Sequence, residues 1–145
     1  MARLGYSSAV TRILAIDFGE KRIGLATADA SAGLATARRT IRRASDGKAT
    51  SEIARFCREE EIGILLVGLP RSPEGEESAI SPRIRSFSDK LARETALPLV
   101  FHEETLTSDE AGRRLRGRRS RAGVDAEAAA VLLEDWLAHR GRESA

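Results

Sequence analysis

Residues 13–19 read Ile-Leu-Ala-Ile-Asp-Phe-Gly, an apolar run that ends in a carboxylate and a glycine. A second apolar run, residues 23–28, begins just after the basic pair Lys21-Arg22. Two apolar runs joined by a short polar link predict a tight hairpin, with Asp17 near the end of a buried strand. Because a buried carboxylate is costly unless a cation meets it, Asp17 is a candidate ligand for a metal ion or a contact to a phosphate.

Three apolar segments with short links predict an antiparallel meander. We expect its strands at residues 13–18, 22–28 and 34–41. The Asp46-Gly47 pair is expected to break the meander, and a helix with one apolar face follows from Ala49. Residues 62–68 form a continuous apolar run, which is typical of a central parallel strand covered on both faces.

The second half of the chain alternates between helix and strand signals. Ser81 is a candidate N-cap with Pro82 at the first helical position, and Thr107 with Glu110 has the form of a capping box. We expect a short strand at residues 98–101 and a last helix at residues 124–139. A meander followed by strand–helix units predicts an α/β fold, a mixed five-stranded sheet with helices on both faces.

The length and composition are typical of one folded domain. We expect that domain at residues 13–139, between a flexible lead-in at 1–12 and a flexible tail at 140–145. With 41% hydrophobic and 32% charged residues, the composition argues against a disordered chain. One cysteine, Cys57, excludes a disulfide framework and a cysteine-based zinc site, and we interpret it as a core residue. The cytoplasm is therefore the expected compartment.

Arginine supplies most of the positive charge, and much of it lies in two clusters. The first cluster consists of Arg38, Arg39, Arg42 and Arg43. The second consists of Arg113, Arg114, Arg116, Arg118, Arg119 and Arg121. Guanidinium groups suit phosphate oxygens. The second cluster is denser and bridges two expected helices, so it favours a nucleic-acid contact, whereas the first fits a solvated surface equally well.

Acidic residues stand at the ends of three apolar elements. Asp17 closes the first strand, Glu103-Glu104 closes the strand after Pro98, and Asp125 opens the last helix. If the first strand and the strand after Pro98 run parallel, Asp17 and Glu104 lie at the C-terminal edge of the sheet, where α/β sites gather. For Asp125 the alternative is a helix-terminal aspartate that binds backbone N–H groups.

Taken together, these acids predict a metal site. Converging carboxylates repel one another, and divalent cations between them keep them ionised. Mg²⁺ or Mn²⁺ suits oxygen ligands and needs only one or two carboxylates per ion. Two such ions about 3.5–4 Å apart can activate a water and stabilise the leaving oxygen of a phosphodiester. His102 lies beside the acids and is interpreted as structural.

Four short motifs, in the same order and at similar spacing, resemble those of the YqgF/RuvX family, which is assigned to pre-16S rRNA processing and described as Holliday junction resolvase-like. They are DFGEKRIG at 17–24 (family DFGxKRIG), VGLP at 67–70, EETLTS at 103–108 (family DERLTT), and GVDA at 123–126 (family VDALAA), which leads into LLEDWL at 132–137. The matches cover most of the chain, and their order makes them specific.

The resemblance implies an RNase H-like fold and a metal-dependent, two-metal-ion nuclease that matures the 5′ end of pre-16S rRNA. It implies Asp17, Glu104 and Asp125 as catalytic residues and as ligands of Mg²⁺ or Mn²⁺, with Glu103 a weaker candidate. The substrate would be precursor rRNA or structured DNA, bound by a monomer or weak homodimer. The residues of the protein that we expect to contact the nucleic acid are Lys21, Arg22, Arg118, Arg119 and Arg121.

Two positions depart from the family pattern. Glu103 stands where the family has aspartate, and Thr105 stands where it has arginine. A contact from that arginine to a phosphate or an acid is therefore absent at Thr105. The three acids at positions 17, 104 and 125 are all retained, which argues for a working site.

Three other functions remain open from the residues. A DNA junction resolvase needs two symmetric cuts and hence a stable dimer. A non-catalytic factor that associates with RNA or ribosomes would use the arginine clusters alone. ATP binding is a third alternative, because an Asp-x-Gly turn between strands also occurs in actin-like folds, which need two such domains around the nucleotide.

Overall fold

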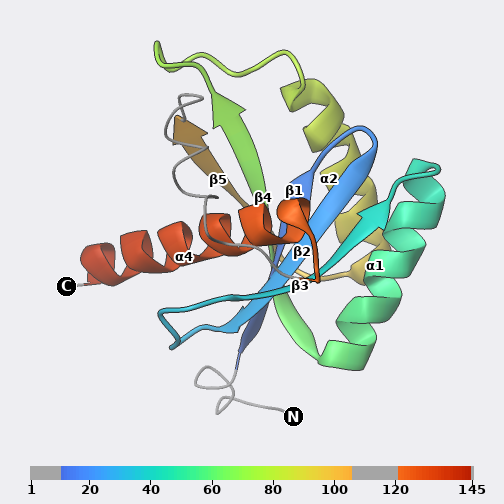
Figure 1. Ribbon diagram of the computed structural model, residues 1–145, viewed down its shortest axis with the longest axis horizontal. Coiled ribbons are helices and arrows are strands. Elements are labelled where there is room, and N and C mark those ends of the chain that lie inside the picture. Colours follow the sequence, from blue (N-terminus) through green and yellow to red (C-terminus); the bar gives the residue numbers. More distant parts are fainter. Residues whose placement is uncertain (1–10, 106–120, 145) are drawn as a thin grey trace.

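The computed structural model describes residues 11–105 and 121–144, which form a mixed five-stranded sheet flanked by helices (Figure 1). The strands are β1 (Arg12–Phe18), β2 (Arg22–Asp29), β3 (Thr36–Arg42), β4 (Ile62–Arg71) and β5 (Leu99–Thr105). The helices are α1 (Asp46–Glu60), α2 (Ser81–Thr95) and α4 (Val124–Ser144). The spatial order of the strands is β3-β2-β1-β4-β5.

Strand directions confirm the predicted mixed sheet. β1, β2 and β3 pair antiparallel as a meander, while β4 pairs parallel with β1 and β5 pairs parallel with β4. β1, rather than β4, is the middle strand of the sheet. Because β1, β4 and β5 run parallel, their C-terminal ends lie at one edge of the sheet.

Helices pack on both faces of the sheet, as the sequence predicts, and an apolar core lies between the helices and the sheet on each face. On one face, α1 and α2 contribute residues such as Ile53 and Phe87 to a cluster that includes Leu65 of β4. On the other face, α4 contributes residues such as Leu133 to a cluster that includes Leu66 of β4. Adjacent residues of β4 thus face opposite cores, which explains its unbroken apolar run.

Cys57 is a core residue, as predicted. It is buried in the cluster beneath α1 and α2. Burial raises the pKa of its thiol to about 11, so the thiol is protonated at neutral pH.

Both α1 and α2 begin earlier than predicted. The meander ends before the Asp46-Gly47 pair, as predicted, but this pair already opens α1, because the Ser45 hydroxyl accepts a 3.1 Å bond from Lys48 N and caps the helix. Ser81 is the first residue of α2, and the N-cap is Ile80, which has no side-chain cap bond. Pro82 is therefore the second residue of α2, one position later than predicted.

Two other elements are longer than predicted. β5 continues beyond residue 101 to Thr105, because its pairing with β4 extends to Arg71. α4 continues beyond residue 139 to Ser144. The expected capping box at Thr107 lies outside the described residues, and the domain boundaries stay predictions. No helix in the described part of the chain is long and apolar enough to cross a membrane.

Candidate functional site

Asp17, Gly24 and Thr40 form one row across three strands. Asp17 pairs with Gly24, and Gly24 pairs with Thr40. Ile13 and Ala15 of β1 pack in the core beneath α4. Because strand side chains alternate between faces, Asp17 points to that same face. The row therefore lies under the N-terminal end of α4.

Gly24 allows the first turn of α4 to approach the sheet. A Cβ on Gly24 would lie 1.9 Å from the backbone oxygen of Asp125 and 2.6 Å from Ala126 N. No side chain fits in that space, so only glycine lets the helix backbone lie against β2 here. Since Gly24 is also the partner of Asp17, this contact places Asp125 beside Asp17.

Thr40 holds the start of α4 with two hydrogen bonds. Its hydroxyl donates to the Ala122 carbonyl oxygen at 2.6 Å and accepts from Ala126 N at 3.2 Å. Because the first N–H groups of a helix have no partner within the helix, the second bond caps α4 from a neighbouring strand. The contact between Thr40 and the start of α4 thus fixes the position of Asp125. The Asp125 carboxylate accepts a hydrogen bond from Arg22.

The carboxylates of Asp17 and Asp125 repel each other. Burial, and then the nearby Asp125 carboxylate, raise the pKa of Asp17 to about 6. Asp125 Oδ2 accepts a 2.9 Å hydrogen bond from Arg22 Nε, and the Arg22 side chain is 60% exposed. Among the described residues, the one cation that bonds to these two acids is largely exposed, so a bound metal ion would stabilise them.

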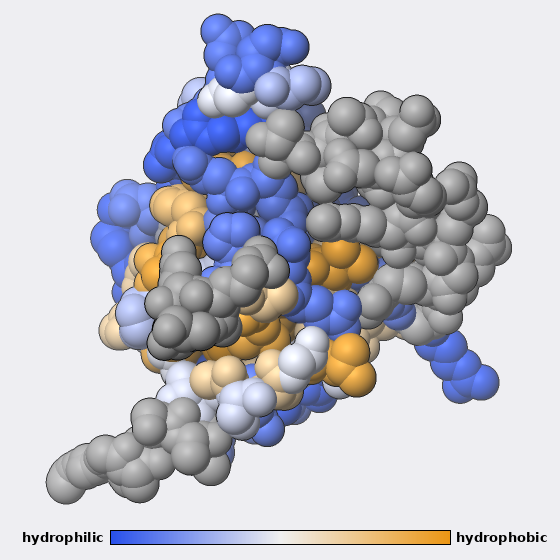
Figure 2. Space-filling view, turned by 90° about the vertical axis from the view of Figure 1, so that its left-hand side faces the viewer, coloured by the Kyte–Doolittle hydropathy of each residue, from blue (hydrophilic) through white to orange (hydrophobic). Residues whose placement is uncertain are grey.

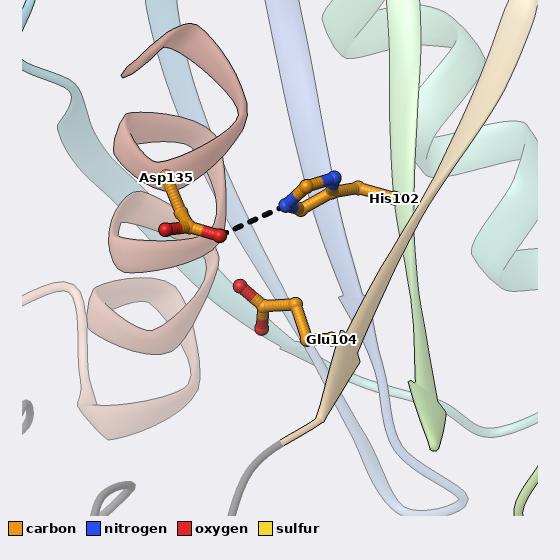
Figure 3. Close-up of side chains that lie close together, drawn as sticks. All are labelled: His102, Glu104 and Asp135. Atoms are coloured by element: carbon orange, nitrogen blue, oxygen red, sulfur yellow. Dashed lines mark hydrogen bonds and ion pairs between the residues drawn. The ribbon is translucent and has the colours of Figure 1, made fainter. Parts of the chain in front are cut away.

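Glu104 belongs to a second group of polar side chains, with His102 and Asp135. Each of the three offers one ligand atom, and these atoms all lie within 4.8 Å of one another. Figure 3 shows His102 and Glu104 on β5 directed toward Asp135 on α4, with His102 Nε2 2.9 Å from Asp135 Oδ2. Leu99 and Phe101 of β5 pack in the opposite core, which is why His102 and Glu104 face α4.

Sequence comparison identifies the family. The RuvX family model, described as Holliday junction resolvase, matches residues 11–139 of the chain. The chain belongs to the RuvX family. A protein of Anaeromyxobacter sp. (strain Fw109-5) named "Putative pre-16S rRNA nuclease" is 40% identical over 131 residues, 87% of this chain and 96% of the relative. A relative of the same name from Nitratidesulfovibrio vulgaris (strain DP4) is 39% identical over 132 residues, 88% of this chain and 93% of the relative.

Solved structures confirm the RNase H-like fold that the RuvX resemblance predicted. RuvC of Thermus thermophilus in complex with a Holliday junction matches with a TM-score of 0.59 and 16% identity. The match covers 90% of this chain and 95% of RuvC. A second structure of Thermus thermophilus RuvC gives a TM-score of 0.58 and 16% identity over 90% of this chain and 96% of that chain. At this identity the likeness concerns the fold.

In this RuvX member, Glu103 is separated from the other acids. It neighbours Glu104 on β5 and therefore faces the opposite side of the sheet. Its carboxylate accepts a 2.9 Å bond from Arg71 Nε and a second, shorter bond from the same guanidinium. These bonds lower the pKa of Glu103. Glu103 is thus engaged in an ion pair away from α4.

The structure divides the predicted acids between two neighbouring groups. Asp17 and Asp125 lie close enough to repel each other, whereas Glu104 has a ligand atom within 4.8 Å of those of His102 and Asp135. Asp125 and Asp135 are ten residues apart on α4, or about 15 Å along the helix axis. α4 thus crosses the sheet face with one acid near β2 and another near β5. Asp135 was not predicted, although it lies in the quoted LLEDWL stretch.

The predicted nucleic-acid contacts are exposed where the structure describes them. Lys21 and Arg121 are exposed, as is Arg22, whereas Arg118 and Arg119 lie outside the described residues. Figure 2 shows hydrophilic residues over much of one side of the molecule, with small apolar areas between them. An exposed basic residue beside Asp125 suits a polyanionic partner.

Most of the first arginine cluster makes contacts within the protein. Arg38 pairs with Glu60 at 2.8 Å, Arg39 lies 3.7 Å from Glu52, and Arg43 pairs with Asp46 at 2.9 Å. These bonds favour a structural role over phosphate binding for the three arginines.

Proposed function

We propose that this protein is a metal-dependent nuclease that hydrolyses phosphodiester bonds in the 5′-end maturation of pre-16S rRNA, a step of ribosome biogenesis in the cytoplasm. Family membership and the names of the relatives at 39–40% identity support nuclease activity on this RNA. The fold it shares with RuvC supports the same class of chemistry.

The observation that carries this proposal is that the carboxylates of Asp17 and Asp125 lie close enough to repel each other. Asp17 is held in a buried position where its pKa is raised to about 6. A protein gains no stability from two neighbouring acids in such a place. Their presence is understandable if they bind a cation during function.

The donor set fits Mg²⁺ or Mn²⁺. Asp17, Glu104 and Asp125 are the proposed ligands and catalytic residues, and carboxylate oxygens are the ligands these ions prefer. Two bound ions would activate a water and offset the charge that develops on the phosphate. The protein's own residues hold the acids in place and contact the RNA backbone, for which Arg22, Lys21 and Arg121 are exposed on the described surface.

The proposal is tested by cleavage of end-labelled precursor rRNA in Mg²⁺ or Mn²⁺. We expect the unmodified protein to cut near the mature 5′ end and Asp17→Asn to lose at least about 100-fold in rate, as for removal of one group that stabilises developing charge. Asp89→Asn is the matched control, because Asp89 lies on α2 and pairs only at the surface with Arg93. Equal cleavage by Asp17→Asn would refute the assignment. RNA binding without any cleavage would favour a non-catalytic factor.

A Holliday junction resolvase is the second candidate. The family description and the fold match to RuvC bound to a junction favour it. Symmetric cleavage of a four-way junction requires two active sites in one dimer. The same assay on a labelled junction, with the oligomeric state measured at the assay concentration, separates the two. Paired cuts by a dimer would favour DNA, and cleavage of precursor rRNA alone would favour RNA.

A further inference from the structure

We propose that His102, Glu104 and Asp135 form a binding site for a divalent first-row transition-metal ion. Two of these residues, His102 and Asp135, lie outside the predicted acid set. The three ligand atoms lie within 4.8 Å of one another on described residues of β5 and α4. It shares Glu104 with the proposed nuclease site and differs from that site in His102 and Asp135.

The fold brings these side chains together for a local reason. His102 and Glu104 are two residues apart on β5, so they share the face that α4 covers. The neighbour of His102 on β4 is Gly68, and a Cβ there would lie 3.2 Å from a methyl carbon of Leu132. The missing side chain at Gly68 lets α4 approach the sheet, and Asp135 follows Leu132 by one helical turn. Asp135 therefore reaches His102 directly.

The spacing of the ligand atoms suits a chelated ion. A metal about 2.1 Å from each of its ligands holds neighbouring ligand atoms about 3.0 Å apart in octahedral geometry and about 3.4 Å apart in tetrahedral geometry. His102 Nε2 and Asp135 Oδ2 are already 2.9 Å apart. Glu104 lies within 4.8 Å of both, so a small movement of one flexible side chain completes the set.

The chemistry of the set selects the kind of ion. Imidazole nitrogen is a ligand for Zn²⁺, Co²⁺, Ni²⁺ and Mn²⁺, whereas Mg²⁺ and Ca²⁺ prefer oxygen alone. The His102 side chain is 12% exposed and Asp135 is 32% exposed, so one side stays open to solvent. That opening leaves a path for the ion to enter and room for water in the remaining coordination positions.

A simple hydrogen-bonded pair is the competing explanation. A histidine can bond an aspartate without any metal, and the 2.9 Å contact alone does not distinguish the two cases. The position of Glu104 favours a metal site over a simple hydrogen bond, because Glu104 adds a second carboxylate beside the His102–Asp135 pair. One histidine with two carboxylates is a ligand set of matched charge for a divalent ion.

Calorimetric titration of the metal-free full-length protein with Zn²⁺ tests the site. The unmodified protein should bind one Zn²⁺ that Mg²⁺ in large excess does not displace. His102→Gln retains a hydrogen-bonding side chain and should fold, yet it should lower Zn²⁺ affinity about 100-fold or more, as should Asp135→Asn. His139→Ala is the matched control, because its ring lies 5.8 Å from that of His102 and it contributes no ligand to the group. It should bind Zn²⁺ as the unmodified protein does.

The outcomes also separate this site from the proposed nuclease. Asp17→Asn should keep its Zn²⁺ affinity, and Mn²⁺ bound to that variant should still give a nitrogen coupling in pulsed EPR spectra that His102→Gln lacks. Zinc binding that His102→Gln and Asp135→Asn leave unchanged, or no zinc binding by the unmodified protein, would overturn the inference. A protein that binds Zn²⁺ through His102 but cuts no nucleic acid would support this site while refuting the nuclease.

Discussion

Gly24 lies directly opposite Asp17 in the β1–β2 hairpin, and the backbone of Asp125 packs directly against the same glycine. This single position joins the two acids, because no side chain separates the strand from the helix. The Thr40 hydroxyl continues the row and fixes the helix end from β3. The acid pair is therefore built by backbone contact and capping, before any ligand is considered.

Replacement of Gly24 by alanine should displace α4 from the sheet. The added Cβ would lie 1.9 Å from a backbone oxygen, and backbone gives way less easily than a flexible side chain. We expect a loss of about 3 kcal/mol in the free energy of unfolding, measured in urea. Gly33→Ala is the control, since a Cβ there meets nothing within 4 Å. If both variants unfold at the same urea concentration, the close packing of α4 on Gly24 is wrong.

Asp17→Asn should stabilise the metal-free protein at neutral pH. The pKa of Asp17 is about 6 in the folded protein and 3.8 in the unfolded chain. As pH rises from about 4 to 6, the unfolded chain ionises first, so the folded state loses about 3 kcal/mol that it does not regain at higher pH.

Unfolding curves recorded from pH 4 to pH 8 test this sign. The unmodified protein should lose stability relative to Asp17→Asn across that range, and the two should be nearly equal at pH 4. Saturating Mg²⁺ should then stabilise the unmodified protein more than the variant. A variant less stable than the unmodified protein at pH 8 without metal would contradict the destabilisation assigned to the ionised Asp17 carboxylate.

Thr40→Val should weaken the start of α4. Valine has the same shape but loses the bonds to Ala122 O and Ala126 N. We expect a cost of about 1 kcal/mol, as for loss of a helix cap. Thr36→Val on the same strand is exposed and serves as the control. Hydrogen exchange at Ala126 N should accelerate in Thr40→Val alone, and unchanged exchange would argue against the cap.

Asp46→Asn should destabilise the α1–α2 contact. Asp46 accepts hydrogen bonds from Arg43 and Arg83, and bonds from Arg83 are the main reason its pKa is lowered. We expect a loss of about 2 kcal/mol at pH 7. Because the folded pKa lies below 3.8, the stabilisation is present above that pH and is lost as pH falls through the folded value. The difference between variant and unmodified protein should thus shrink in acid, and a constant difference down to pH 2 would contradict the ion pairs.

Sequence patterns predicted the sheet well because burial dictates them. The apolar runs of β1, β2 and β4 reflect strands covered on two faces, and their order predicted the meander and parallel strands. The predicted bounds were wrong where tertiary contacts determine the start or end of an element. Asp46-Gly47 resembles a turn, but Ser45 caps it and the arginines stabilise Asp46. β5 was predicted too short because Glu103 and Glu104 interrupt its apolar character.

The site was only partly readable for a similar reason. Asp17 was evident as an acid on a buried strand, but nothing local predicts that Gly24 and Thr40 hold Asp125 beside it. His102 could be placed with Glu104, since the two are two residues apart on a strand. Asp135 could not, because its approach depends on how α4 crosses Gly68.

The most direct test of the central claim is the position of Mn²⁺ in a soaked crystal, located by anomalous scattering. The claim is that Asp17 and Asp125 together hold a catalytic cation. We expect an anomalous peak within about 2.5 Å of a carboxylate oxygen of each residue, and its loss in Asp17→Asn. Mn²⁺ bound elsewhere in the crystal, with no density between Asp17 and Asp125, would contradict the claim.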